Sequence, residues 1–93
     1  MNVAEGKFEV LSAAIRRLRD WPIQRKADLR PWYEAARGVS DMVCETDGVF
    51  TDDDFHFLMH WLADADIRLK DAKYAAMQNE RLREVLAELG AKD

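Results

Sequence analysis

The sequence predicts an all-α protein, a small bundle of three to four helices with a long third helix or a C-terminal helical extension. Residues 51–89 contain neither Gly nor Pro, and apolar residues recur at helical spacing along most of the chain. No segment alternates Val, Ile and Thr as a strand would. Apolar residues make up 48% of the 93 residues, enough for one modest core. We therefore expect a single domain over residues 1–93, with helices at approximately 3–19, 31–45, 52–75 and 76–89.

The first predicted helix covers residues 3–19. Asn2 is a favoured N-cap, and Glu5 stands three residues later, where it would complete a capping box. One face of this helix is apolar and contains Phe8, Leu11, Ile15 and Leu18. Pro22 pushes Trp21 out of the helical region and ends the helix.

The second predicted helix covers residues 31–45. Pro31 suits the first helical position, because the N–H that proline lacks would have no partner inside the helix there. Its apolar face contains Trp32, Ala35, Ala36, Val39, Met42 and Val43. Asp47 and Gly48 predict a turn, and Thr51 is the predicted N-cap of the next helix.

Residues 51–89 carry two apolar stripes that would lie on roughly opposite sides of one straight helix. The first stripe contains Phe55, Leu58, Leu62, Ala65, Leu69, Ala72 and Ala76. The second contains Leu82, Val85, Leu86 and Leu89, and Gly90 follows it as a C-terminal cap. A straight helix cannot press both stripes onto one core. Either the chain breaks near residues 70–78 and the last helix folds back, or the second stripe is a self-association surface of a homodimer.

Charge is divided unevenly along the chain. Residues 1–39 carry eight basic and five acidic groups, whereas residues 40–93 carry six basic and thirteen acidic groups, within a net charge of −4. Either these charges form an ordinary solvated surface, or each half presents a recognition surface of one sign.

An acidic and aromatic helical face is the predicted partner-binding surface. It contains Asp47, Asp52, Asp53, Asp54, His56, Phe57, His60, Trp61 and Asp64. Carboxylates beside exposed aromatic rings suit a protein partner with a basic groove. We therefore expect a non-enzymatic protein-interaction module, a small adaptor or inhibitor. One form would be an inhibitor of a nucleic-acid-binding protein, of the kind that phages and mobile elements encode.

A dimeric nucleic-acid-binding regulator is the alternative. Its contact surface would be the basic segment 16–37, where Trp side chains are interleaved with cations. The cations of this prediction are Arg16, Arg17, Arg19, Arg25, Lys26 and Arg30. The overall acidity argues against strong nonspecific binding, so nucleic acid ranks below a protein partner.

A weaker alternative is a divalent-metal site formed by Asp53, His56 and His60, whose spacing places them in neighbouring helical turns. The helical zinc-protease signature is absent, because no Glu follows the first His. Nor does the sequence contain a nucleophile elbow, a triad spacing or a phosphate-binding loop. We expect no enzymatic activity and no cofactor.

The sequence also indicates the cellular compartment of the protein. Unbroken apolar runs are short, as at Phe57–Met59, so no membrane span is expected. Met1 leads directly into a helical pattern instead of an export signal, and Cys44 is the single cysteine. These features favour a cytoplasmic protein.

Overall fold

A computed structural model describes residues 3–46 and 50–88 of the chain. Its elements are α1 (Val3–Asp20), the 3-10 helix η1 (Lys26–Asp28), α2 (Leu29–Glu45), α3 (Asp52–Ala63), α4 (Ala65–Lys70) and α5 (Ala72–Glu88). No strand occurs in these two ranges, so the predicted all-α bundle is confirmed. Within the same ranges, no helix has both the length and the apolar character that crossing a bilayer requires.

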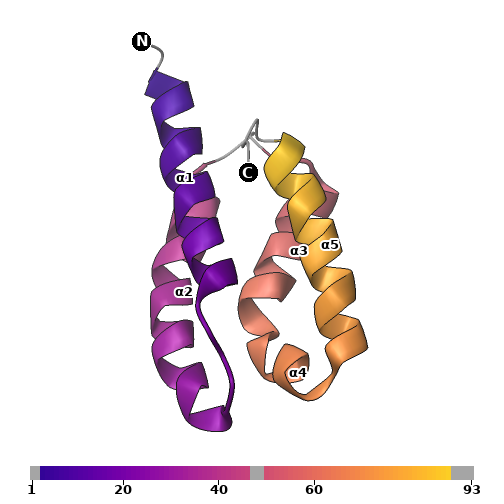
Figure 1. The fold of residues 1–93 in the computed structure, drawn as a ribbon. Coiled ribbons are helices and arrows are strands. Elements are labelled where there is room, and N and C mark those ends of the chain that lie inside the picture. The colour runs from indigo at the N-terminus through magenta and orange to yellow at the C-terminus, as the bar shows by residue number, and fades with distance from the viewer. Residues whose placement is uncertain (1–2, 47–49, 89–93) are drawn as a thin grey trace.

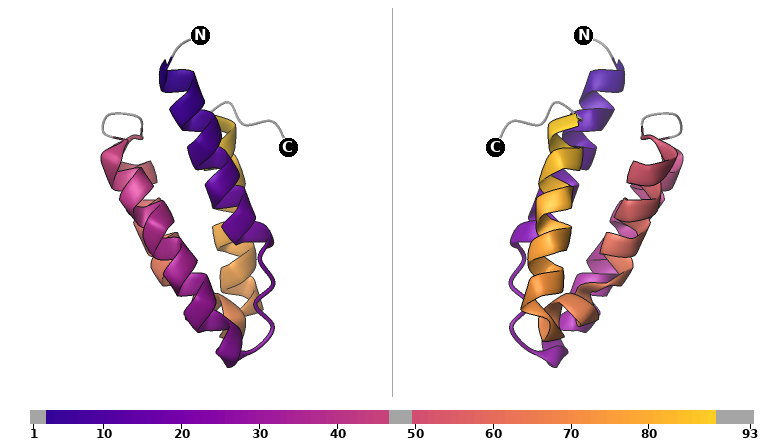
Figure 2. Two further views of the ribbon diagram at one scale, coloured as in Figure 1. Left: turned by 90° about the vertical axis from the view of Figure 1, so that its left-hand side faces the viewer. Right: turned by 90° about the vertical axis from the view of Figure 1, so that its right-hand side faces the viewer.

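The four long helices alternate in direction, and the short α4 crosses one end of the bundle between α3 and α5 (Figure 1). In the two side views, α1 and α5 lie on one side of the molecule, and α2 and α3 lie on the other (Figure 2). Helix α2 contacts both α1 and α3, and α5 contacts α3 and α4. The second half of the chain therefore closes the bundle that α1 and α2 begin.

One hydrophobic core lies between these helices. Its buried apolar residues are Leu11, Ile15, Leu18, Trp32, Ala36, Val39, Val43, Leu58, Trp61, Leu62, Ala65, Leu82, Val85 and Leu86. Trp32 of α2 contacts two neighbouring helices. Its indole Nε1 donates a hydrogen bond of 3.0 Å to the carbonyl oxygen of Leu18. Its ring also meets that of Trp61 edge to face, with centroids 5.5 Å apart. Helices α1, α2 and α3 are thus joined at this point.

The chain breaks twice after α3, so the helix expected over residues 52–75 is not continuous, and the alternative in which the chain breaks near residues 70–78 and folds back is confirmed. Asp64 leaves the helical region, with φ −107° and ψ 19°, and Asp71 is extended, with φ −128° and ψ 103°. The Tyr33 hydroxyl caps the first break by donating to the carbonyl oxygen of Ala63 at 3.0 Å. Asp71 starts α5, because its Oδ1 accepts hydrogen bonds from the backbone N–H groups of Lys73 and Tyr74. Helix α5 therefore begins at residue 72, not 76.

Because α5 folds back, the described part of the second apolar stripe is buried within the same chain. Leu82, Val85 and Leu86 are 0%, 0% and 1% exposed, because they fill the core of their own chain. The expectation that these three residues form a self-association surface is wrong in this fold. Leu89, the fourth residue of that prediction, lies outside the described residues.

Candidate partner-binding groove

The N-terminal turn of α3 holds three consecutive aspartates in two different environments. Thr51 caps the helix, its Oγ1 accepting a hydrogen bond of 3.1 Å from the backbone N–H of Asp54. Asp52 and Asp53 are exposed, whereas Asp54 is buried. The positive end of the helix dipole stabilises carboxylates here. Only Asp52 and Asp53 are therefore available to a partner.

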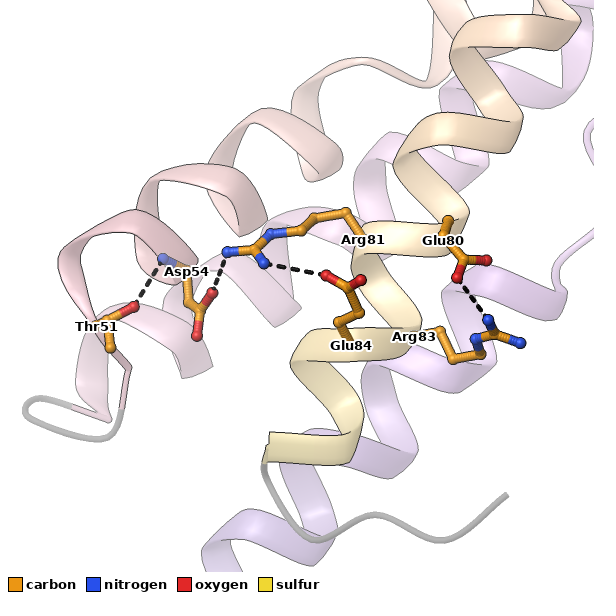
Figure 3. A network of polar contacts seen from close by, with 6 residues as sticks. All are labelled: Thr51, Asp54, Glu80, Arg81, Arg83 and Glu84. Atoms are coloured by element: carbon orange, nitrogen blue, oxygen red, sulfur yellow. Dashed lines mark hydrogen bonds and ion pairs between the residues drawn. The ribbon is translucent and has the colours of Figure 1, made fainter.

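Asp54 is buried because it pairs with Arg81 of α5. Arg81 Nη2 lies 2.7 Å from Asp54 Oδ1, and Arg81 Nη1 lies 3.2 Å from Glu84 Oε2 (Figure 3). The hydrogen bond to Glu84 and the charge of Asp54 keep the pKa of Arg81 above its ordinary value. The Arg81 guanidinium also lies 6.0 Å from the centre of the Phe57 ring. These contacts hold α5 against the start of α3.

A groove of about 430 Å³ runs between α3 and α5, and most of its surface is apolar. Its lining residues are Asp53, His56, Phe57 and His60 of α3, and Tyr74, Met77, Gln78 and Arg81 of α5. Met77 is 61% exposed, although it is a large apolar side chain. We call this feature the α3–α5 groove.

His56 and His60 form a pair on the α3 side of the groove. Their Nε2 atoms are 3.0 Å apart and their ring centroids 4.5 Å apart, so one imidazole donates a hydrogen bond to the other. Among the described residues, no three His, Cys, Asp or Glu side chains form a group that could hold a metal ion. The structure therefore does not bring Asp53 together with the two histidines as a three-ligand site.

Asp64 belongs to the polar network that holds α5 against the end of α3. Its Oδ2 accepts hydrogen bonds from the Tyr74 hydroxyl at 2.6 Å and from Gln78 Nε2 at 3.1 Å. The bond to Asp64 raises the pKa of Tyr74. Trp61, another predicted contact residue, is 1% exposed and lies in the core.

The structure thus divides the predicted partner-binding residues. Asp53, His56, Phe57 and His60 come together in the groove, and Asp52 is exposed in the acidic turn of the same helix. The prediction is wrong for Trp61, which is buried. Asp54 and Asp64 are held in internal contacts, and Asp47 lies outside the described residues.

Sequence reasoning missed the α5 side of the groove. This side faces α3 only because the chain reverses after α4, and it consists of Tyr74, Met77, Gln78 and Arg81. Asp71 was the available signal, since Asp is a favoured N-cap residue and stands directly before residue 72, where α5 begins.

The basic segment is spread over α1, η1 and α2. Arg17, Arg25, Lys26 and Arg30 are exposed, whereas Arg16 and Arg19 are partly buried. Ion pairs between described residues link Arg19 with Asp20 at 3.0 Å, Arg25 with Asp28 at 3.9 Å, and Arg30 with Glu34 at 3.6 Å. Partial neutralisation of this kind weakens a phosphate-binding surface.

Comparisons with protein-family models, with curated proteins and with solved structures found no match for this chain.

Proposed function

We propose that this protein is a non-enzymatic interaction module, a small adaptor or inhibitor that binds a protein partner in the α3–α5 groove. The observation that carries the proposal is the apolar groove with Met77 exposed in it and carboxylates at the start of α3. An exposed methionine beside a half-buried aromatic ring is typical of surfaces that accept varied apolar side chains. Phe57 supplies that ring.

Charge specifies the chemistry of the partner. Asp52 and Asp53 are exposed, and Asp53 lines the groove itself. A segment that places an apolar side chain in the groove and Lys or Arg beside the two aspartates would satisfy both features. A nucleic-acid-binding protein offers such basic segments, and an inhibitor that occupied its cleft would use this arrangement.

The test compares two pairs of variants in affinity capture from a lysate of the source organism, followed by mass spectrometry. Asp52→Asn with Asp53→Asn removes charge beside the groove, and Asp41→Asn with Glu45→Gln removes the same charge from α2. Met77→Ser removes the exposed apolar side chain, and Val10→Ser is its matched control, since Val10 is 60% exposed on α1. Circular dichroism verifies that each variant retains its helicity.

The proposal requires a protein that wild type and both control variants capture after nuclease treatment, and that both groove variants lose. Equal capture by all variants would contradict it. Loss of every partner on nuclease treatment would favour the alternative, the regulator that binds nucleic acid through segment 16–37. In that case Arg17→Ala with Arg30→Ala should weaken binding, and the affinity should fall steeply with salt.

Dimerisation remains a separate prediction. The residues expected to carry it fill the core of one chain, so a homodimer would have to use another face. Sedimentation equilibrium over a range of protein concentrations measures this directly.

A further inference from the structure

A second cavity, of about 190 Å³, lies on another part of the bundle. It is lined by residues of all five α-helices that the structure describes and of the connection between α1 and η1. All three tryptophans of the chain, Trp21, Trp32 and Trp61, line it. Arg19, Arg68 and Asn79 supply polar groups among lining residues that are otherwise apolar. We call this feature the tryptophan cavity.

Arg68 is held rigidly at this cavity. Its Nη1 donates hydrogen bonds to the carbonyl oxygen of Trp61 at 2.6 Å and to Gln78 Oε1 at 2.7 Å. Its guanidinium lies 4.8 Å from the centre of the Trp61 ring and 5.2 Å from that of the Trp32 ring. A guanidinium positioned in this way loses little conformational freedom when it binds a ligand.

This cation has no carboxylate in direct contact among the described residues. Within residues 3–46 and 50–88, Arg68 forms no ion pair, and its Nε and Nη2 atoms make no hydrogen bond. The charges of Asp64 and Asp66 favour the charged form of Arg68, although neither forms an ion pair with it. Partial burial has the larger effect and lowers the pKa of Arg68, but the group stays charged at neutral pH.

Trp61 also bears an unpartnered polar group. Its indole Nε1 is buried and has no hydrogen-bond partner among the described residues. A buried donor without a partner costs about 1–3 kcal/mol. Trp61 and Arg68 line the same cavity, so one acceptor group could serve both.

We infer that the tryptophan cavity binds a small carboxylate with a planar apolar body. The carboxylate would accept hydrogen bonds from the unused guanidinium nitrogens of Arg68, and the body would pack against the indole rings. The size agrees: a cavity of about 150 Å³ holds benzene, and this one has about 190 Å³. Such a site is separate from the α3–α5 groove and does not depend on the function proposed for it.

Benzoate is the probe, followed by ¹H–¹⁵N NMR of the uniformly labelled full chain at constant ionic strength. The three indole N–H signals report directly on the cavity, and Trp61→Phe assigns the signal of Trp61. A saturable shift of that signal is expected, with a dissociation constant in the millimolar range or tighter. Benzamide, a neutral molecule of the same shape, should bind about tenfold more weakly because it lacks the charge.

Two variants locate the binding. Ala75→Leu should fill the cavity and abolish the shift, whereas Ala76→Leu, at an exposed position of the same helix, should leave it unchanged. Arg68→Lys retains the charge but lacks the guanidinium fork, so benzoate should bind about tenfold more weakly.

Three results would overturn the inference: no saturable shift with benzoate, equal affinity for benzamide, or unchanged binding in the Ala75→Leu variant. Inorganic phosphate at the same concentrations distinguishes the ligand class. A phosphate shift at the Trp61 signal equal to that of benzoate would mean a general anion site, and would refute the requirement for an apolar body. If Arg68→Lys failed to fold, the benzamide comparison and the Ala75→Leu variant would still decide the question.

Discussion

Arg81 Nη2 lies 2.7 Å from Asp54 Oδ1, and this ion pair fixes the start of α3 to the middle of α5. The two residues are 27 positions apart in the sequence, and the side chain of Asp54 is 5% exposed. A buried carboxylate that keeps its charge needs such a partner. The pair therefore determines how the two walls of the α3–α5 groove lie against each other.

Removing the Arg81 guanidinium should destabilise the fold. Arg81→Met leaves the buried Asp54 carboxylate without its partner, which should lower the free energy of unfolding by about 1–3 kcal/mol. Arg83→Met is the matched control, because the ion pair of Arg83 within residues 3–46 and 50–88 is with the exposed Glu80 of the same helix. That surface pair should contribute about 0–0.5 kcal/mol. Urea unfolding followed by circular dichroism measures both, and equal losses would refute the structural role of the Asp54 pair.

Glu88 should make stability depend on pH. Hydrogen bonding and charge from the neighbouring Asp54 raise the pKa of Glu88 above the ordinary value of 4.5. The folded chain then binds this proton more tightly than the unfolded chain, so stability falls as pH rises from 4.5 through the folded pKa. Above that window the repulsion between the two carboxylates is complete.

Glu88→Gln removes this repulsion. The variant should therefore unfold at a higher temperature than wild type at pH 7, and the difference should vanish below the ordinary glutamate pKa of 4.5. Thermal unfolding at both pH values, followed by circular dichroism, measures the two differences. An increase in the unfolding temperature of the same size at both would show that electrostatic repulsion is not the cause.

Thr51 should stabilise α3 through its hydroxyl. Thr51→Ala removes the acceptor for the Asp54 N–H, and loss of an N-cap costs about 0.5–2 kcal/mol. Thr51→Ser keeps the oxygen and should stay within about 0.5 kcal/mol of wild type. Chemical unfolding of the three proteins in parallel gives the comparison. Equal destabilisation by both substitutions would assign the effect to the lost methyl group instead.

Trp32 should be the most sensitive of the aromatic positions. Trp32→Phe loses the hydrogen bond to Leu18 and leaves a cavity in the core, which together should cost about 1–3 kcal/mol. Trp21→Phe is the control, since Trp21 is only partly buried. Its cost should be about 1 kcal/mol or less. A larger loss at Trp21 than at Trp32 would contradict this assignment of the core anchor.

Local sequence signals predicted the first half of the fold well. The helix that ends before Trp21–Pro22 and the cap at Thr51 both appear, because caps, prolines and apolar spacing act within a few residues. The second helix begins two residues earlier than predicted, at Leu29, because η1 leads directly into it. The all-α class follows from the same short-range patterns.

The candidate site was predicted only on its α3 side. His56, Phe57 and His60 were expected on one acidic and aromatic helical face, and all three line the groove. Met77 and Arg81 were not, because they reach the groove through a chain reversal that no single residue specifies. Trp61 was wrongly assigned to the partner-binding surface. It is buried, because other helices cover it, and that packing is not visible in the local sequence.

The sequence by itself determined that this chain is helical, where most helices start, and that its second half carries two opposed apolar stripes. The tertiary structure alone decided that Leu58, Leu62 and Ala65 of the first stripe enter one core with part of the second stripe, whereas Phe55, Ala72 and Ala76 stay exposed. That outcome depends on two breaks. The break at Asp64 is stabilised by Tyr33 and Tyr74, which are distant in sequence, and the break at Asp71 by its own local cap. Helix propensity acts between neighbours, whereas the direction of a reversal depends on contacts between residues far apart in sequence.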